Sequence, residues 1–135
     1  MLTSTLYKIW GNDVTIKYFS EDLKNIKKLL PKFNICLVNY YEHGKKAIGW
    51  HSDNEEKGST SCIASISLGA ERQFSFRKTG TKEIYKSILL HHGSLLVMGE
   101  GCQENYQHSL MVSKCKTPRL NLTFRLFDCD RYINY

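Results

Sequence analysis

The chain has 135 residues, of which 41% are hydrophobic and 24% charged, with only two prolines and nine glycines. This composition is typical of a globular protein and excludes collagen-like, coiled-coil and disordered chains. The length suits one domain over residues 1–135. No apolar run approaches the roughly 18 residues that a membrane helix needs, and the N-terminus lacks the layout of a secretory signal. We therefore expect a soluble, monomeric intracellular protein of the cytoplasm or nucleus, with no membrane partner.

The chain is basic, since it contains 19 Lys and Arg residues and 13 Asp and Glu residues, which gives a net charge of +6. A basic balance favours anionic partners such as nucleic acid, because phosphates attract cations over long distances. A charge that only serves solubility is an equally good interpretation at this point. The five cysteines are an odd number and form no C-x-x-C pair, which argues against a disulfide scaffold or a zinc site.

One helix is predicted near the N-terminus. Ser20 is a good N-cap, Leu23, Ile26 and Leu30 share one helical face, and Pro31 ends the helix. We expect this helix, within a short N-terminal segment of residues 1–32, to cover a sheet formed by the rest of the chain.

The remainder of the chain has the period of strands. Short runs rich in β-branched and aromatic residues alternate with turn signals such as Thr79-Gly80 and His92-Gly93. The predicted strands are Asn34–Tyr41, Ala47–Trp50, Cys62–Leu68, Gln73–Arg77, Ile84–Leu89, Ser94–Met98 and Leu120–Phe127. Many short strands in one domain predict a mostly-β (α+β) fold, a sandwich or jelly roll with one covering helix.

The triplet His51-Ser52-Asp53 follows one of these strands. Side chains two residues apart on an extended strand point to the same side, so this imidazole and this carboxylate can meet one metal ion. A second histidine would complete the two-His-one-carboxylate face of non-haem Fe(II) oxygenases. Chance also produces H-x-D, and the third ligand stays open at this point. The candidates are His43, His91, His92 and His108.

The last predicted strand alternates strictly between polar and apolar residues. Its polar positions are Arg119, Asn121, Thr123 and Arg125, and its apolar positions are Leu120, Leu122, Phe124 and Leu126. Two arginines and an amide on one face suit an anion bound between them, since a guanidinium pairs with a carboxylate through two hydrogen bonds. A solvated outer face would show the same alternation, and both interpretations remain open here.

Five segments together resemble the AlkB family of Fe(II)- and 2-oxoglutarate-dependent dioxygenases, and most closely its cellular DNA/RNA-repair members. The segments are N-Y-Y-E-H-G-K-K-A-I-G-W-H-S-D-N-E (39–55), I-A-S-I-S-L-G-A-E-R-Q-F-S-F-R (63–77), G-S-L-L-V-M (93–98), Y-Q-H-S-L (106–110) and P-R-L-N-L-T-F-R (118–125). The resemblance implies a double-stranded β-helix (jelly roll) with a catalytic core over residues 33–127. The segment before Phe33 is shorter than the nucleotide-recognition lid usual in this family.

The resemblance also implies roles for individual residues. Three residues would hold Fe(II): His51, Asp53 and His108. Five would bind 2-oxoglutarate. Arg119, with Tyr41 and Asn121, would hold its distal carboxylate, and Arg125, with Asn39, would contact the end that chelates the metal. Arg125 also counts among the catalytic residues. Three would lie near the methylated base: Glu55, whose charge suits a cationic base, and Arg72 and Phe76 on a strand near the substrate.

The activity implied by the resemblance is oxidative demethylation of N-alkylated bases such as N1-methyladenine and N3-methylcytosine. It would consume O2 and 2-oxoglutarate and release succinate, CO2 and formaldehyde. The partner would be single-stranded DNA or RNA, or a flipped base. Two alternatives remain: an Fe(II)/2-oxoglutarate hydroxylase acting on a protein or small molecule, and an inactive nucleic-acid-binding module. Glu55 and the basic charge favour a nucleic-acid demethylase over the first of these alternatives.

Overall fold

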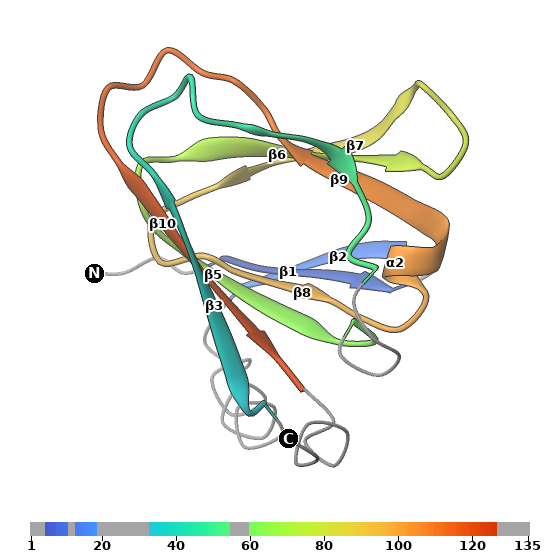
Figure 1. Ribbon diagram of the computed structural model, residues 1–135. Helices are drawn as coiled ribbons and strands as arrows, with labels where there is room; N and C mark the ends of the chain where they lie inside the picture. The colour runs from blue at the N-terminus through green and yellow to red at the C-terminus, as the bar shows by residue number, and fades with distance from the viewer. Residues whose placement is uncertain (1–4, 11–12, 19–32, 55–59, 127–135) are drawn as a thin grey trace, which may run out of the picture.

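Two β-sheets face each other and form a wedge (Figure 1). The computed structural model describes residues 5–10, 13–18, 33–54 and 60–126, with side chains from residue 33 onward. Among these residues the chain is almost entirely strand, and neighbouring strands are antiparallel except for one parallel pair. The mostly-β prediction is therefore confirmed, whereas the predicted N-terminal helix lies outside the described residues.

The larger sheet contains six strands in the order β2-β1-β8-β5-β10-β3. Their bounds are β1 (Thr5–Trp10), β2 (Asp13–Tyr18), β3 (Ile35–Tyr41), β5 (Ile63–Gly69), β8 (Leu95–Met98) and β10 (Arg119–Arg125). The strand β10 pairs with β3 on one side and with β5 on the other. Its side chains are therefore held in a fixed register between two neighbours.

The smaller sheet contains four antiparallel strands in the order β4-β9-β6-β7. Their bounds are β4 (Ile48–His51), β6 (Arg72–Lys78), β7 (Ile84–Leu90) and β9 (Tyr106–Leu110). A single turn of helix, α2 (Cys102–Asn105), precedes β9. No helix among the described residues has the length and apolar character to cross a membrane.

The seven predicted strands are all present, with ends shifted by one or two residues. Three further strands were not predicted: β1, β2 and β9. The last of these reads Tyr-Gln-His-Ser-Leu, in which polar residues interrupt the β-branched pattern that marks a strand.

The apolar core lies between the sheets and extends behind β5 and β8. The inner cluster consists of Ile63, Phe76, Ile88, Leu90, Leu96, Met98, Cys102 and Tyr106. A second cluster is centred on Ala64, Leu95 and Val97. Because successive side chains of a strand point to opposite faces, β8 is buried on both faces, which explains its uninterrupted apolar sequence Leu-Leu-Val-Met.

The strand β10 reverses the usual relation between polarity and burial. Its polar residues Arg119 and Arg125 are 2% and 5% exposed, whereas Leu120 on the opposite face is 37% exposed. The polar face therefore points between the sheets, and the interpretation of a solvated outer face is wrong. Burying two guanidinium groups is costly unless charged partners meet them, so this face marks the functional site.

Candidate metal and co-substrate site

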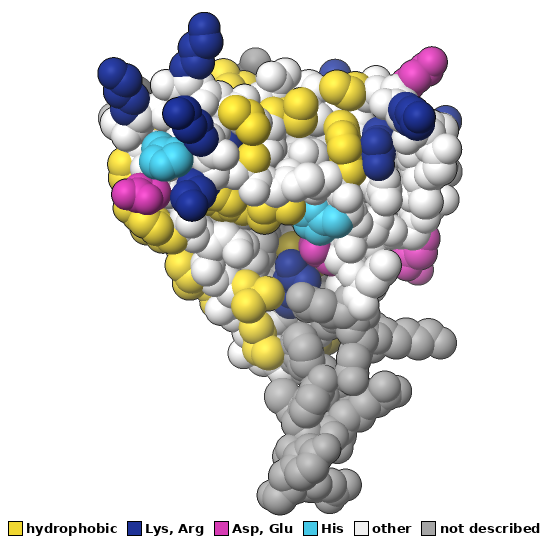
Figure 2. Space-filling view, turned by 45° about the horizontal axis from the view of Figure 1, so that its top comes forward, with side chains coloured by type: hydrophobic (Ala, Val, Ile, Leu, Met, Phe, Trp, Pro, Cys, Tyr) yellow, Lys and Arg dark blue, Asp and Glu magenta, His cyan; other side chains and the backbone are white. Residues whose placement is uncertain are grey.

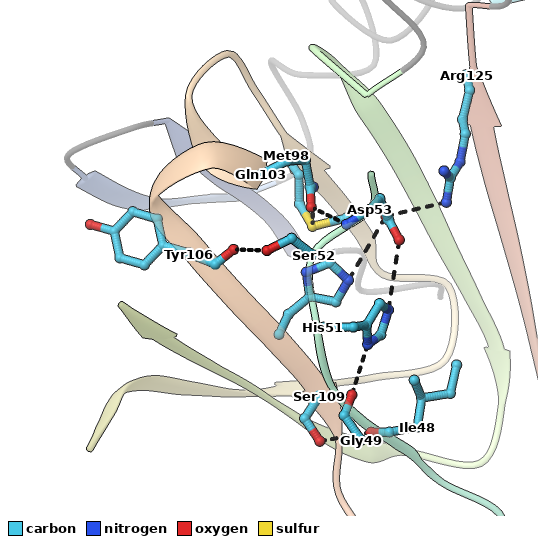
Figure 3. A network of polar contacts seen from close by, with 11 residues as sticks. Ile48, Gly49, His51, Ser52, Asp53, Met98, Gln103, Tyr106, Ser109 and Arg125 are labelled. Atoms are coloured by element: carbon cyan, nitrogen blue, oxygen red, sulfur yellow. Dashed lines mark hydrogen bonds and ion pairs between the residues drawn. The ribbon is translucent and has the colours of Figure 1, made fainter. Parts of the chain in front are cut away.

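The segment that carries His51 and Asp53 is fixed by α2 and the start of β9 (Figure 3). The strand β4 ends at His51, so Asp53 lies beyond the last strand hydrogen bond. The Asp53 N–H donates to Oε1 of the buried Gln103 at 2.9 Å, and Ser52 Oγ donates to the Tyr106 carbonyl at 2.8 Å. These two bonds replace the strand ladder and turn the Asp53 carboxylate toward both histidines.

His51, Asp53 and His108 converge at one point. His51 of β4 lies directly opposite His108 of β9 in the sheet. His51 Nε2 lies 3.6 Å from Asp53 Oδ1, and His108 Nε2 lies 3.8 Å from Asp53 Oδ2. One ligand atom from each residue lies within 4.8 Å of the others, and no other such group occurs among the described residues. Two imidazoles and one carboxylate form the ligand set of non-haem Fe(II) oxygenases, so these residues fit the predicted ion.

The hydrogen bond of His51 and the protonation of His108 both suit metal binding. His51 Nδ1 lies 2.7 Å from the Gly49 carbonyl oxygen, which can only accept, so Nδ1 carries the proton and Nε2 is left as the ligand atom. Burial lowers the pKa of His108 to about 4, and His51 and Arg125 add to this effect while Asp53 opposes it. His108 is therefore neutral at physiological pH, the form in which imidazole binds a metal.

Arg125 connects this triad to β10. Its Nη2 lies 3.2 Å from Asp53 Oδ2, and its side chain is almost fully buried. On the other side, the ring of Phe74 stacks on His108 with centroids 5.3 Å apart. The metal ligands are thus held by an ion pair and by an aromatic wall.

A narrow cavity of about 60 Å³ runs from the triad along the inner faces of β3 and β10. Its polar lining beyond the triad consists of Asn39, Tyr41, Ser65, Arg119, Asn121, Thr123 and Arg125. The Asn121 amide is fixed on β5, because Nδ2 donates to Ser65 Oγ at 2.6 Å. The five residues implied to bind 2-oxoglutarate therefore line one cavity that leads from the metal ligands.

Arg119 lies in this cavity as a buried cation. Its Nη2 donates to Ser67 Oγ at 2.9 Å, whereas its Nε has no hydrogen-bond partner among the described residues. Burial lowers the pKa of Arg119 to about 10; Tyr41 opposes this shift and Arg72 adds to it. A carboxylate in the cavity would satisfy this guanidinium, so the residues present fit a dicarboxylate such as 2-oxoglutarate.

Two residues predicted to lie near the substrate do not line the cavity. Phe76 is fully buried in the core behind His108, and Arg72 is 1% exposed with its guanidinium bonded to backbone carbonyls. The role of these two residues near a base therefore stays a prediction, and of the residues on this face of β6 it is Phe74 that lies at the cavity. Glu55 lies outside the described residues.

The other candidate histidines lie elsewhere. His91 Nδ1 lies 2.8 Å from Glu71 Oε1, and His92 Nδ1 accepts from the Gly69 N–H. His43 lines a separate cavity of about 730 Å³. The structure thus leaves His108 as the second histidine of the site.

Comparison with known proteins agrees with this geometry. The sequence pattern of the 2OG-Fe(II) oxygenase superfamily matches residues 13–125. The chain belongs to this superfamily. Membership indicates Fe(II), 2-oxoglutarate and O2 as the reagents that the site uses, and the His-Asp-His triad is able to bind the metal.

Within the 2OG-Fe(II) oxygenases, the chain is an AlkB-family protein. It is 37% identical over 132 residues to the DNA oxidative demethylase ALKBH2 of Arabidopsis thaliana, covering 78% of this chain and 42% of that protein. It is 41% identical over 103 residues to the mouse alpha-ketoglutarate-dependent dioxygenase alkB homolog 3, covering 69% and 36%. The chain therefore spans less than half the length of these relatives.

A solved structure gives the same result for the fold. The structure of OsALKBH1 superimposes with a TM-score of 0.58 at 25% sequence identity, covering 70% of this chain and 48% of that one. The two facing, mostly antiparallel sheets fit the jelly-roll oxygenase fold that the sequence predicted.

Proposed function

We propose that this AlkB-family oxygenase demethylates N-alkylated nucleic-acid bases, such as N1-methyladenine and N3-methylcytosine, with Fe(II), 2-oxoglutarate and O2. The products would be the normal base, formaldehyde, succinate and CO2. The observation that carries the proposal is the His51–Asp53–His108 triad beside a cavity that contains the buried Arg119. A module that only binds nucleic acid would need neither feature.

The residues of the chain would divide the work as follows. His51, Asp53 and His108 would hold the iron, which would supply the oxidising chemistry at the N-methyl group when it is bound with the co-substrate. Arg125 would hold the Asp53 carboxylate in its orientation through their 3.2 Å ion pair. Arg119 would pair with the distal carboxylate of 2-oxoglutarate and so fix its position along the cavity.

A basic corner of the surface supports nucleic acid as the substrate (Figure 2). Lys45, Lys114 and Lys116 line the larger cavity between the β3–β4 turn and the loop after β9. Two backbone bonds join these loops: Gly44 N–H donates to the Cys115 carbonyl, and Ser113 N–H donates to the Gly44 carbonyl. The lysines therefore stand on two loops that backbone hydrogen bonds join, where their charges can meet phosphates.

This surface can be tested by charge reversal. Replacing Lys114 and Lys116 together by Glu should weaken binding of a short single-stranded oligonucleotide roughly tenfold or more and reduce its salt dependence, because each phosphate contact releases a counterion. The matched control replaces the exposed Lys82 and Lys86, on and beside β7, by Glu. Equal weakening in both double variants would contradict a local phosphate-binding surface.

The proposed reaction is tested by comparing two single-stranded oligonucleotides that differ only by one N1-methyladenine. With Fe(II), 2-oxoglutarate and O2, the methylated strand should lose the mass of one methylene and yield equimolar formaldehyde and succinate. Succinate without any change in the oligonucleotide would contradict the substrate and favour a protein or small-molecule hydroxylase. Neither product, from folded protein that has bound iron, would contradict the enzymatic activity itself.

A further inference from the structure

A second buried guanidinium lies behind the co-substrate cavity. Arg72 begins β6 and is 1% exposed. It lies two residues before Phe74, so both side chains point to the inner face of the sheet. The Cζ atoms of Arg72 and Arg119 lie 6.0 and 5.4 Å from the centroid of the same ring, that of Tyr41. The two cations therefore share one aromatic neighbour at the same end of the cavity.

The hydrogen bonds of Arg72 do not neutralise its charge. Its Nη2 donates to the carbonyl oxygens of Gly44, Lys46 and Met111 at 3.1, 2.8 and 2.7 Å. Its Nε and Nη1 are buried without a hydrogen-bond partner among the described residues. Carbonyl dipoles solvate a cation, but burying a charge without a counter-ion remains costly.

The acidic side chains in this region are engaged elsewhere. Glu71, the preceding residue, is exposed and pairs with His91, and Asp53 pairs with Arg125. Within the described part of the chain, neither Arg72 nor Arg119 forms an ion pair with a carboxylate. Burial raises the pKa of Tyr41, and the charges of Arg119 and Arg72 oppose this shift. Burial lowers the pKa of Arg119, and the charge of Arg72 adds to that shift. This end of the cavity thus has two positive charges and no described anion.

We propose that Arg72 is a positioning residue that makes the cavity selective for a 2-oxo acid with a second carboxylate. It would act without touching the co-substrate, because it does not line the cavity. The charge of Arg72 adds to that of Arg119 on the other side of Tyr41. Its three hydrogen bonds to backbone carbonyls hold the turn after β3 and the residue after β9 against β6. The inference rests on the proposed use of 2-oxoglutarate and assigns it a specificity residue.

The test compares two ligands that differ in one carboxylate. Anaerobic calorimetry on the Fe(II)-loaded protein would measure Kd for 2-oxoglutarate and for 2-oxopentanoate, which has the same carbon chain but no distal carboxylate. Arg72→Gln should weaken 2-oxoglutarate roughly tenfold or more, since a charge acts strongly across a buried, low-dielectric site. Binding of 2-oxopentanoate should weaken less than about threefold. Arg72→Lys, which keeps the charge, should restore most of the preference.

A purely structural role would give a different result. If Arg72→Gln weakened both acids equally, or left both unchanged, the charge of Arg72 would not select the ligand and the inference would be overturned. Thermal unfolding would show that the variant is folded. If Arg72→Gln does not fold, Arg72→Met provides the same comparison, because it fills the site without burying a new amide.

The wild type separates this inference from the proposed function. If the Fe(II)-loaded wild type binds neither acid, both the proposed function and the inference are overturned. If the wild type prefers 2-oxoglutarate and Arg72→Gln keeps the same preference, the proposed function stands and only the role of Arg72 is overturned. Loss of the preference in Arg72→Gln together with its return in Arg72→Lys supports the inference.

Discussion

Gln103 is predicted to set the affinity of the metal site, although it is not a ligand. Its Oε1 accepts the Asp53 N–H at 2.9 Å, and the side chain is 6% exposed. Asp53 lies beyond the end of β4, so this bond and its neighbour at Ser52 replace the strand ladder. Gln103→Leu keeps most of the side-chain volume but removes the acceptor.

The magnitude follows from the unpaired donor. A buried N–H without a partner costs about 1–3 kcal/mol. If the segment moves to let that N–H reach water, the cost appears instead as misplacement of the carboxylate. Fe(II) binding should then weaken roughly 5- to 100-fold, the range expected when a group that supports a metal ligand is removed. If the segment stays in place, the free energy of unfolding of the variant should instead decrease by the same amount.

The assay measures the anaerobic Kd for Fe(II) and the free energy of unfolding of the metal-free protein. Gln107→Leu is the matched control: Gln107 lies on β9, and its Oε1 accepts a bond from Arg77 Nε instead of from Asp53. This control should leave the Kd unchanged. If Gln103→Leu had wild-type affinity for Fe(II) and wild-type stability, the assigned role of Gln103 would be wrong.

Three further predictions address the site directly. Asp53→Ala should abolish Fe(II) binding and succinate formation while the protein stays folded. The control Glu83→Ala, at an exposed carboxylate, should retain both. Iron binding by Asp53→Ala would contradict the assignment of the triad. Arg119→Ala should cost about 2–4 kcal/mol in 2-oxoglutarate binding through loss of a buried charge pair, and an unchanged Kd would refute its role. His108 has a pKa of about 4 in the folded protein against 6.5 ordinarily, so the unfolded state takes up the proton first as pH falls. The free energy of unfolding of the metal-free protein should therefore decrease between pH 6.5 and about 4, by on the order of 3 kcal/mol; a similar decrease in His108→Gln would rule out His108 as the cause.

Strand period predicted the elements that form the site better than it predicted their surroundings. It placed β3, β4, β5 and β10 within two residues, because runs rich in β-branched and aromatic residues stand there between turn signals. It could not decide which face of β10 is buried, because an alternating strand has the same pattern whichever face meets solvent. The burial of the polar face depends on the four-stranded sheet across the wedge and on the anion the cavity is expected to hold.

The sequence could not predict how deeply individual side chains are buried or which residues far apart in the chain contact each other. Arg72, Phe74 and Phe76 share one face of β6, yet only Phe74 reaches the cavity. Phe76 packs into the apolar core, and the Arg72 guanidinium is held by backbone carbonyls. Gln103 carries no local signal either. Its bond to Asp53 joins residues that are 50 positions apart, and only the folded arrangement of α2 beside β4 creates it.

Anaerobic binding of 2-oxoglutarate with and without Fe(II) tests the central claim most directly. The wild type should bind one Fe(II) per chain through His51, Asp53 and His108, and 2-oxoglutarate should bind at least about tenfold more tightly once the metal is present, because one ligand completes the site of the other. The Asp53→Ala variant should lose this coupling. Iron-independent binding of 2-oxoglutarate, or the same coupling in Asp53→Ala, would contradict the assignment of this site.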